Sequence, residues 1–216
     1  MHAIAPDGKP LITCETAADL HAWLAANHTQ RHGIWLARYR AHIGKPALGY
    51  DDMVEELLCW GWIDSKSGTL DDERSLIWIA PRRTGSGWSS SNKQRIEHLE
   101  RSGRMQRTGA DVVAAAKTSG DWTRLDQSER GEIPDDLAEA LSAIPAADQH
   151  FRAFPMGVRK AILQWIASAK RPATRTARIH EVAALAADNI RANQWPRTLP
   201  TDQQLARIHA ALKADQ

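Results

Sequence analysis

The segment from residue 81 to residue 95 contains the residue types best suited to binding an anion. Arg82 and Arg83 follow a predicted strand and precede the run Gly85-Ser86-Gly87. A guanidinium can donate two parallel hydrogen bonds to a phosphate or a carboxylate, and glycines let the backbone approach a ligand closely. The segment therefore predicts a site for a small anionic ligand or for an acidic segment of a partner protein.

The same segment enters a predicted helix through one aromatic and four small polar side chains. They are Trp88, Ser89, Ser90, Ser91 and Asn92. Ser91 with Gln94 fits a capping box, and Ser90 is the alternative cap. The unpaired N–H groups at a helix N-terminus favour an anion, and the indole can stack on a ring of the ligand. We expect Trp62 and Asp64 to back this surface.

A purely structural interpretation of these residues is also open. Serines cap many helices, glycines close loops, and Arg82 can pair with Asp64 or Glu55. The glycine-rich Walker pattern, which indicates phosphate binding far more specifically, is absent from the sequence.

A second cluster of residues has the chemistry for proton transfer or nucleophilic attack. Its members are Glu55, Glu56, Cys59, Trp62 and Asp64. Glu55 and Cys59 are four residues apart, which places them on one face of a predicted helix. No histidine stands at a spacing suited to activating the thiol. The structural interpretation is favoured and the catalytic residues stay unknown, while an enzyme with Glu55 or Asp64 as general base is kept as an alternative.

The histidines and cysteines show no pattern typical of a metal site. His28 and His32 are four residues apart, but the predicted helix ends between them. Neither an HExxH string nor paired CxxC strings occur. We expect no metal and no cofactor.

Charged residues fall into three blocks although the formal net charge is only +2. Residues 51–73 carry eight acidic residues and one lysine, and residues 82–107 carry seven Lys/Arg and two glutamates. Residues 152–178 carry seven Lys/Arg and no acidic residue. The blocks either pair with one another or form separate faces. A nucleic-acid-binding module that uses the two basic blocks is therefore a third, less favoured interpretation.

The composition is that of an ordinary globular protein. With 43% hydrophobic and 25% charged residues, a wholly disordered or collagen-like chain is excluded. No apolar run approaches the roughly 20 residues of a transmembrane helix, and the N-terminus lacks a secretory signal pattern. Two widely separated cysteines, Cys14 and Cys59, fit a reducing compartment. We expect a cytoplasmic protein.

Tryptophan is the one unusual residue type, with nine copies against two Tyr and two Phe. Three of the nine, Trp60, Trp62 and Trp88, are expected around the candidate cleft. The others are expected in the core (Trp23, Trp35, Trp78 and Trp165) or holding loops (Trp122 and Trp195).

Hydrophobic periodicity predicts an α+β fold. After an irregular lead-in over 1–14, strands are predicted at 33–40, 62–64 and 75–80, which form a small three-stranded antiparallel sheet. Helices are predicted from Thr16, from a capping box at Asp52, and over seven later segments. These segments are 91–102, 107–118, 134–143, 145–153, 155–169, 174–193 and 201–213. We expect an α+β N-terminal region with flanking helices over 1–105 and a helical region over 106–216 packed on it, or one continuous domain.

Four strings carry a resemblance to a known family. They are YDDMVEELLCWGWID at 50–64, PRR at 81–83, WSSSNKQRI at 88–96, and AKRP at 169–172 with Thr174-Arg175 and Arg178-Ile179. Together they resemble the YdeI/OmpD-associated proteins, also called bacteriocin-protection proteins, over about residues 10–193. The resemblance implies a role in resistance to cationic antimicrobial peptides and in envelope stress, and the family name implies association with a porin. It brings no catalytic residues.

We therefore predict a cytoplasmic protection protein of this type. It is expected to act by binding an anionic ligand or an acidic partner rather than by catalysis.

Overall fold

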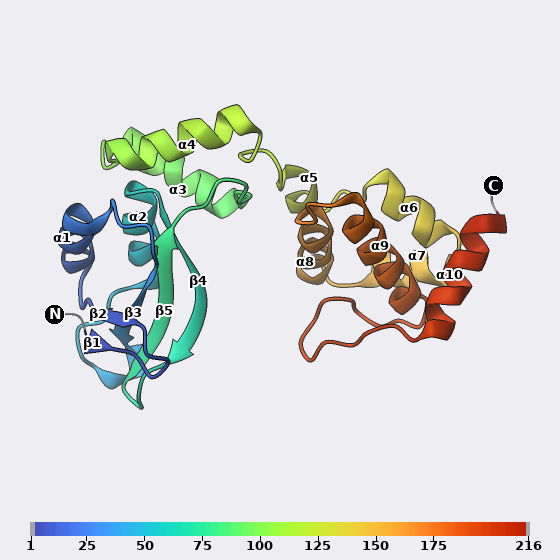
Figure 1. The fold of residues 1–216 in the computed structure, drawn as a ribbon, viewed down its shortest axis with the longest axis horizontal. Coiled ribbons are helices and arrows are strands. Elements are labelled where there is room, and N and C mark those ends of the chain that lie inside the picture. Colours follow the sequence, from blue (N-terminus) through green and yellow to red (C-terminus); the bar gives the residue numbers. More distant parts are fainter. Residues whose placement is uncertain (1–2, 215–216) are drawn as a thin grey trace. The chain divides into compact units, whose positions relative to one another are not determined.

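The computed structural model describes residues 3–214 and divides the chain into two compact units, residues 1–122 and 123–216. We call them the N-terminal unit and the C-terminal unit (Figure 1). The boundary expected between residues 105 and 106 lies inside the N-terminal unit, so the observed division comes about 17 residues later.

The N-terminal unit combines a five-stranded sheet with helices, which agrees with the predicted α+β class. Its strands are β1 (Ala3–Ile4), β2 (Pro10–Thr13), β3 (Ile34–Tyr39), β4 (Trp62–Thr69) and β5 (Arg74–Pro81). Its helices are α1 (Ala17–Asn27), α2 (Tyr50–Cys59), α3 (Ser90–Arg101) and α4 (Arg107–Ser119), with the short 3-10 helix η1 (Ala41–Ile43).

The strands follow the order β1-β2-β3-β5-β4 across the sheet. Strands β3, β5 and β4 are antiparallel neighbours, as predicted. The prediction of three strands is wrong, because β2 adds in parallel to β3 and β1 pairs antiparallel with β2. These two strands have only two and four residues, and β2 finds its partner across the α1 crossover. Local periodicity is too short to reveal them.

Both faces of the central strand β3 are buried. Ile34 and Leu36 face the larger core, to which all four α-helices of the unit contribute apolar side chains. Trp35 and Ala37 point to the opposite face, into a small cluster completed by the lead-in residue Ala5. Burial on both faces explains why this strand is a nearly continuous apolar run.

The first helix cap follows the sequence prediction and the second does not. Thr16 caps α1 in a complete capping box with Asp19. The box predicted at Asp52 is wrong, because the Gly49 carbonyl already accepts a hydrogen bond from the Met53 N–H and α2 begins at Tyr50. Asp52 lies in the first turn, where its charge is favourable to the helix dipole.

Helix α4 approaches the end of α2 very closely at Gly109. A Cβ atom at this position would overlap the carbonyl oxygen of Cys59, and the Gln106 N–H donates to that same oxygen at 3.1 Å. The absence of a side chain at Gly109 therefore allows α4 to pack on the core.

The C-terminal unit is helical throughout its described residues. Its helices are α5 (Asp126–Glu129), α6 (Asp135–Ser142), α7 (Pro145–Ala153), α8 (Met156–Ala167), α9 (Pro172–Ala187) and α10 (Asp202–Ala214). The five longer helices match predicted segments, whereas the four-residue α5 is too short for periodicity to predict. Helix α9 ends six residues before the predicted end, and Asn189 just beyond it adopts a left-handed φ of 59°.

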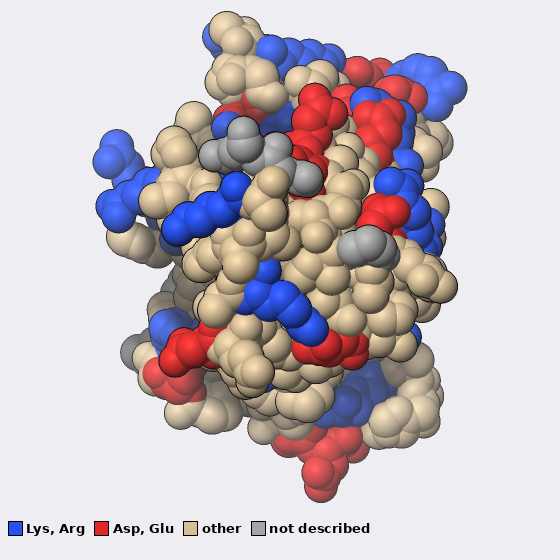
Figure 2. All heavy atoms as spheres, turned by 90° about the vertical axis from the view of Figure 1, so that its right-hand side faces the viewer, with Lys and Arg blue, Asp and Glu red and all other residues tan. Residues whose placement is uncertain are grey.

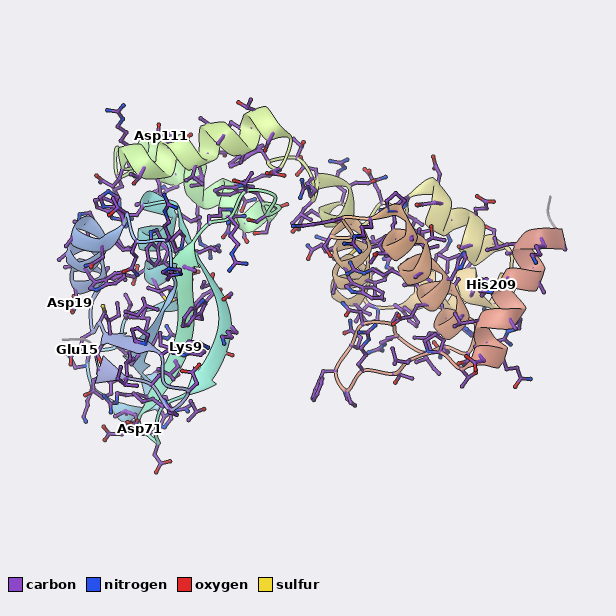
Figure 3. All side chains as sticks on the ribbon, in the orientation of Figure 1. Lys9, Glu15, Asp19, Asp71, Asp111 and His209 are labelled. Atoms are coloured by element: carbon purple, nitrogen blue, oxygen red, sulfur yellow. The ribbon has the colours of Figure 1, made fainter. Side chains whose placement is uncertain are left out.

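Two histidines join the last two helices of this unit. His180 Nδ1 on α9 lies 3.0 Å from His209 Nε2 on α10. His209 is labelled on α10 in Figure 3. The pKa of His180 lies below its ordinary value, first because the ring is partly buried and second because of the charge of His209. Protonation of this pair therefore opposes the docking of α10.

We expect Gly109→Ala to lower the free energy of unfolding of the N-terminal unit by about 1–3 kcal/mol, because the new methyl group overpacks the α2–α4 contact. Gly157→Ala is the matched control, since a methyl group added there in helix α8 would have no atom within 4 Å. That change should be neutral or stabilise by up to about 1 kcal/mol. Urea unfolding followed by circular dichroism checks both, and equal effects would contradict the packing argument.

We expect the C-terminal unit to lose stability as the pH falls below about 6.5. The lowered pKa of His180 means that the unfolded chain binds a proton more readily than the folded unit does. NMR titration of the His180 ring should give a pKa below the ordinary value, and His209→Gln should raise it. A His180 pKa that is unchanged in the variant would argue against coupling of the two rings.

Candidate anion-binding site

The loop that leaves β5 is held in place by a stacking contact between Arg82 and Trp88. The Arg82 guanidinium lies 3.6 Å from the centre of the Trp88 ring, and its Nη2 donates to the Gly87 carbonyl at 2.5 Å. The Arg82 backbone N–H donates to the Gly61 carbonyl at 2.9 Å. Trp88 itself is only 1% exposed and packs against Trp122. Arg82 therefore forms part of the structure of the loop.

Burial lowers the pKa of Arg82 to about 10, while the nearby charges of Asp121 and Asp64 act in the opposite direction. The side chain is thus still cationic at neutral pH. Its Nε atom is buried without a hydrogen-bond partner. The ion pair considered from the sequence, with Asp64 or Glu55, is not found among the described residues.

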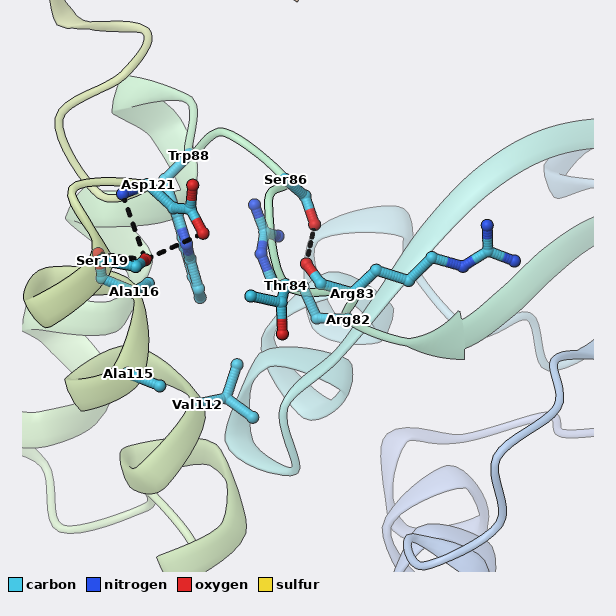
Figure 4. A pocket seen from close by; sticks show the side chains of 10 residues that line it. All are labelled: Arg82, Arg83, Thr84, Ser86, Trp88, Val112, Ala115, Ala116, Ser119 and Asp121. Atoms are coloured by element: carbon cyan, nitrogen blue, oxygen red, sulfur yellow. Dashed lines mark hydrogen bonds between the residues drawn. The ribbon is translucent and has the colours of Figure 1, made fainter. Parts of the chain in front are cut away.

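A small cavity of about 80 Å³ lies between this loop and α4 (Figure 4). Asp121, 4% exposed, lines it and accepts hydrogen bonds from the Gly85 N–H at 2.8 Å and the Ser119 hydroxyl at 2.9 Å. Pockets for small-molecule ligands usually measure about 300–1,000 Å³. This cavity has room for a few water molecules at most.

Arg83 points in the opposite direction, away from Trp88 and the small cavity (Figure 4). It lines a much larger open cleft of about 970 Å³. The residues around this cleft come from the start of β2, the turn after α1 and the end of β5. They are Lys9, Pro10, His28, Thr29, Gln30, Arg31, His32, Gly33, Trp78, Ala80, Pro81, Arg82, Arg83 and Thr84. We call it the cationic cleft.

Sheet topology brings these distant segments together. Because β2 and β3 are parallel, Pro10 and Gly33 both lie where strands start at the same edge of the sheet. Strand β5 is antiparallel to β3, with Ile79 opposite Ile34, so its final residues reach that edge as well. The cationic cleft is the hollow at this edge.

The charged side chains that line the cationic cleft are all cationic among the described residues. Arg31 and Arg83 have no carboxylate partner in the part of the chain that the structure describes. Lys9 is different, because its Nζ lies 2.9 Å from Asp7 beside the cleft. Two unpaired guanidinium groups and one partly neutralised lysine therefore face a solvent-filled hollow.

Trp78 forms one wall of the cleft because Gly33 leaves room for its indole. A Cβ at Gly33 would lie 2.5 Å from Cε2 and Nε1 of Trp78. The indole also makes an edge contact with Trp35, with 5.3 Å between ring centres. The core location predicted for Trp78 is therefore only partly correct.

The serine run begins the helix and does not line either cavity. Ser89 is the N-cap of α3 and accepts from the Asn92 N–H at 3.3 Å, so the predicted caps Ser90 and Ser91 are wrong. The Ser91 hydroxyl lies 3.1 Å from that of Ser89. Three consecutive serines offer the same capping chemistry, so their types alone do not reveal which one caps.

Trp62 and Asp64 lie outside the cationic cleft. Trp62 is 1% exposed in the core, and its indole N–H donates to the His28 carbonyl at 3.3 Å. Asp64 accepts from the Tyr50 hydroxyl at 2.9 Å. The structure thus brings Arg82, Arg83 and Trp88 together but directs only Arg83 fully into the cleft.

The carboxylates of α2 are engaged in a network with Arg104. The two Nη atoms of Arg104 donate to Glu55 and to Glu56, each at 2.6 Å. Glu56 is 6% exposed, and its second oxygen lies 2.9 Å from His21 Nδ1. Burial, and secondarily Glu56, raises the pKa of the Cys59 thiol to about 12. The thiol is therefore not a nucleophile at neutral pH, and this geometry favours the structural interpretation.

Three of the seven cations in the basic block of the C-terminal unit form ion pairs. Arg152, Lys160 and Arg175 each form an ion pair, with Asp148, Glu129 and Asp136 respectively. Arg178 donates to the Trp165 carbonyl and lies over that indole. Figure 2 shows cationic and acidic side chains interleaved on the face in view. The face in view is therefore not uniformly basic, although Lys170 and Arg171 have no ion-pair partner among the described residues.

Neither a metal centre nor a membrane span is found in the described residues. No group of three or more His, Cys, Asp or Glu in residues 3–214 is arranged to hold a metal ion. No helix within the same residues has the length and hydrophobicity needed to cross a bilayer.

We expect Arg104→Ala to lower the free energy of unfolding by about 1–3 kcal/mol, because Glu56 is left buried without its arginine partner. Arg107→Ala is the control, because that side chain is 94% exposed and 4.0 Å from Asp111. The control should change stability by no more than about 0.5 kcal/mol. Equal urea midpoints for the two variants would show that the Arg104 network is not stabilising.

Two protein families match different parts of the chain. Residues 12–112 match a family described as a domain of unknown function (DUF8412), and residues 131–189 match the family described as bacteriocin-protection, YdeI or OmpD-associated. No curated protein and no solved structure matches the chain. The second match spans α6 to α9 and contains the AKRP string at 169–172. It is narrower than the resemblance over 10–193, since the strings between 50 and 96 lie in the first match. Over residues 131–189, the chain therefore carries the bacteriocin-protection, YdeI or OmpD-associated domain that the sequence motifs predicted.

Proposed function

We propose that this chain is a cytoplasmic protection protein that acts by binding, and that its N-terminal unit holds a small anionic ligand in the cationic cleft. The observation that carries the proposal is the cleft itself, where Arg31 and Arg83 face a hollow of about 970 Å³ without carboxylate partners among the described residues. The domain match over 131–189 supports a role in bacteriocin protection.

The chemistry of the cleft favours an anion with several acceptor oxygens. Its lining offers guanidinium, ammonium, hydroxyl and indole N–H donors, and none of its described side chains is a carboxylate. A guanidinium already free of an internal partner loses no ion pair when it binds a phosphate or carboxylate. Arg83 and Arg31 are thus the residues that we assign to ligand contact, with Arg82 positioning the loop.

The charge balance of the N-terminal unit favours a small ligand. Residues 1–122 contain fifteen Lys/Arg and fifteen Asp/Glu, so the unit has no formal net charge. Nucleic-acid-binding domains usually carry a broad basic surface that neutralises many phosphates. A local group of cations on a neutral unit attracts an anion over a distance of about 8 Å at physiological salt.

We expect the full chain to bind inorganic diphosphate, and the double variant Arg31→Ala/Arg83→Ala to weaken that binding at least about tenfold, because each guanidinium contributes charged hydrogen bonds. Arg107→Ala removes an exposed arginine elsewhere on the same unit and should leave the affinity unchanged. Isothermal titration calorimetry at fixed ionic strength measures all three proteins.

Cell survival in the presence of a cationic antimicrobial peptide tests the protective role separately. In cells that depend on this chain for survival of a cationic antimicrobial peptide, the double variant should protect less than the Arg107→Ala control at equal expression. In the calorimetry, a wild-type chain that does not bind diphosphate, or a double variant that binds it equally well, would contradict the proposed site.

A further inference from the structure

We infer that the ligand of the cationic cleft is a nucleoside phosphate, with its phosphates at Arg31 and Arg83 and its base or sugar against Trp78. This inference rests on the proposed function and names the ligand class of the same site. It goes further because an anion alone leaves part of the cleft without a partner.

Part of the cleft wall is uncharged. Beside the arginines, the lining includes Pro10, Ala80, Pro81 and the Trp78 indole. The Nζ atoms of Lys9 and Lys66 lie 5.3 and 5.4 Å from the centre of the Trp78 ring, so a base on this ring would displace a lysine or share the ring with it. Apolar and aromatic surface of this kind gains nothing from contact with an inorganic ion, whose charge requires water or donors. A ligand that uses the whole cleft therefore has an anionic end and a flat or apolar body.

Trp78 offers the ligand body a hydrogen-bond donor. Its indole lies against the backbone of Gly33, and both residues line the cleft. The indole N–H has no hydrogen-bond partner among the described residues. By contrast, the N–H groups of Trp35 and Trp62 donate to Asp7 and His28. The Trp78 N–H is thus a donor without an internal acceptor, and the inference assigns it to an acceptor on the ligand body, such as a ring nitrogen or a sugar oxygen.

The cleft is large enough for a ligand of this kind. Its volume of about 970 Å³ lies at the upper end of the range of about 300–1,000 Å³ for small-molecule sites. A phosphate or carboxylate ion alone would leave most of this space to water. A nucleoside phosphate has the length to reach from the arginines to the Trp78 wall.

The number of cations in the cleft favours a nucleotide over a nucleic acid. Binding of a polynucleotide depends on many phosphate contacts and is steeply dependent on salt. Only Lys9, Arg31, Arg82 and Arg83 contribute full charges to the cleft, and two of these four are engaged with Asp7 or Trp88. The remaining free cations suit one di- or triphosphate group.

Calorimetry on the full wild-type chain with three probes, ADP, inorganic diphosphate and adenosine, tests the assignment. ADP should bind at least about tenfold more tightly than diphosphate, since contact of a base with an aromatic wall adds affinity. Adenosine alone should bind weakly or not at all. Trp78→Phe keeps an aromatic ring over Gly33 but removes the N–H. This variant should weaken the binding of ADP about three- to tenfold and should affect the binding of diphosphate less.

Trp165→Phe in the C-terminal unit is the matched control and should change neither affinity. If diphosphate binds and ADP binds no more tightly, the nucleoside assignment is overturned while the anion site stands. If neither ADP nor diphosphate binds, the nucleoside assignment and the proposed anion site are both wrong. If a single-stranded octanucleotide binds far more tightly than ADP with a steep dependence on salt, the ligand is a nucleic acid and the inference is wrong.

Discussion

The stacking of Arg82 on Trp88 determines what the rest of this loop can do. With its guanidinium 3.6 Å from the indole and its backbone N–H bonded to Gly61, Arg82 is fixed toward the core. Successive side chains of an extended backbone point to opposite sides. The Arg83 side chain extends away from Trp88 (Figure 4), and Arg83 lines the cationic cleft. Two adjacent arginines that look equivalent in the sequence thus differ in the structure: Arg82 builds the loop, and Arg83 is the one that we propose contacts a ligand.

Sequence periodicity predicts those parts of the fold that local side chains determine. Strand β3 and helix α1 agree closely with their predicted segments, because burial and the Thr16–Asp19 capping box act within a few residues. Strand β2 escapes prediction, since its four residues become a strand only by pairing with β3 across the α1 crossover. The prediction of Trp62 beside the cleft fails for the same reason, as its burial depends on α1 and is not visible in its own segment.

The cationic cleft is even less accessible to prediction. Arg31 and Lys9 stand in segments without any motif. The antiparallel pairing of β3 with β5 brings Arg31 near Arg83, and the parallel pairing of β2 with β3 adds Lys9. The serine run, which is conspicuous in the sequence, only caps a helix. Neighbours in the chain can be recognised as a motif, whereas a site built at one edge of a sheet requires knowledge of the strand order.

Part of the acidic block at 51–73 pairs with part of the basic block at 82–107. The acidic block at 51–73 is bound by Arg104 at Glu55 and Glu56 and by Arg95 at Asp51. Two of the seven cations of residues 82–107 thus hold α3 and the segment before α4 against α2. Arg31 and Arg83 are not part of this network. Because residues 1–122 carry no formal net charge, the cationic cleft would present an anion with a local positive site on a unit that is neutral as a whole. In the proposed function, this balance favours a compact, multiply charged ligand over a long polyanion.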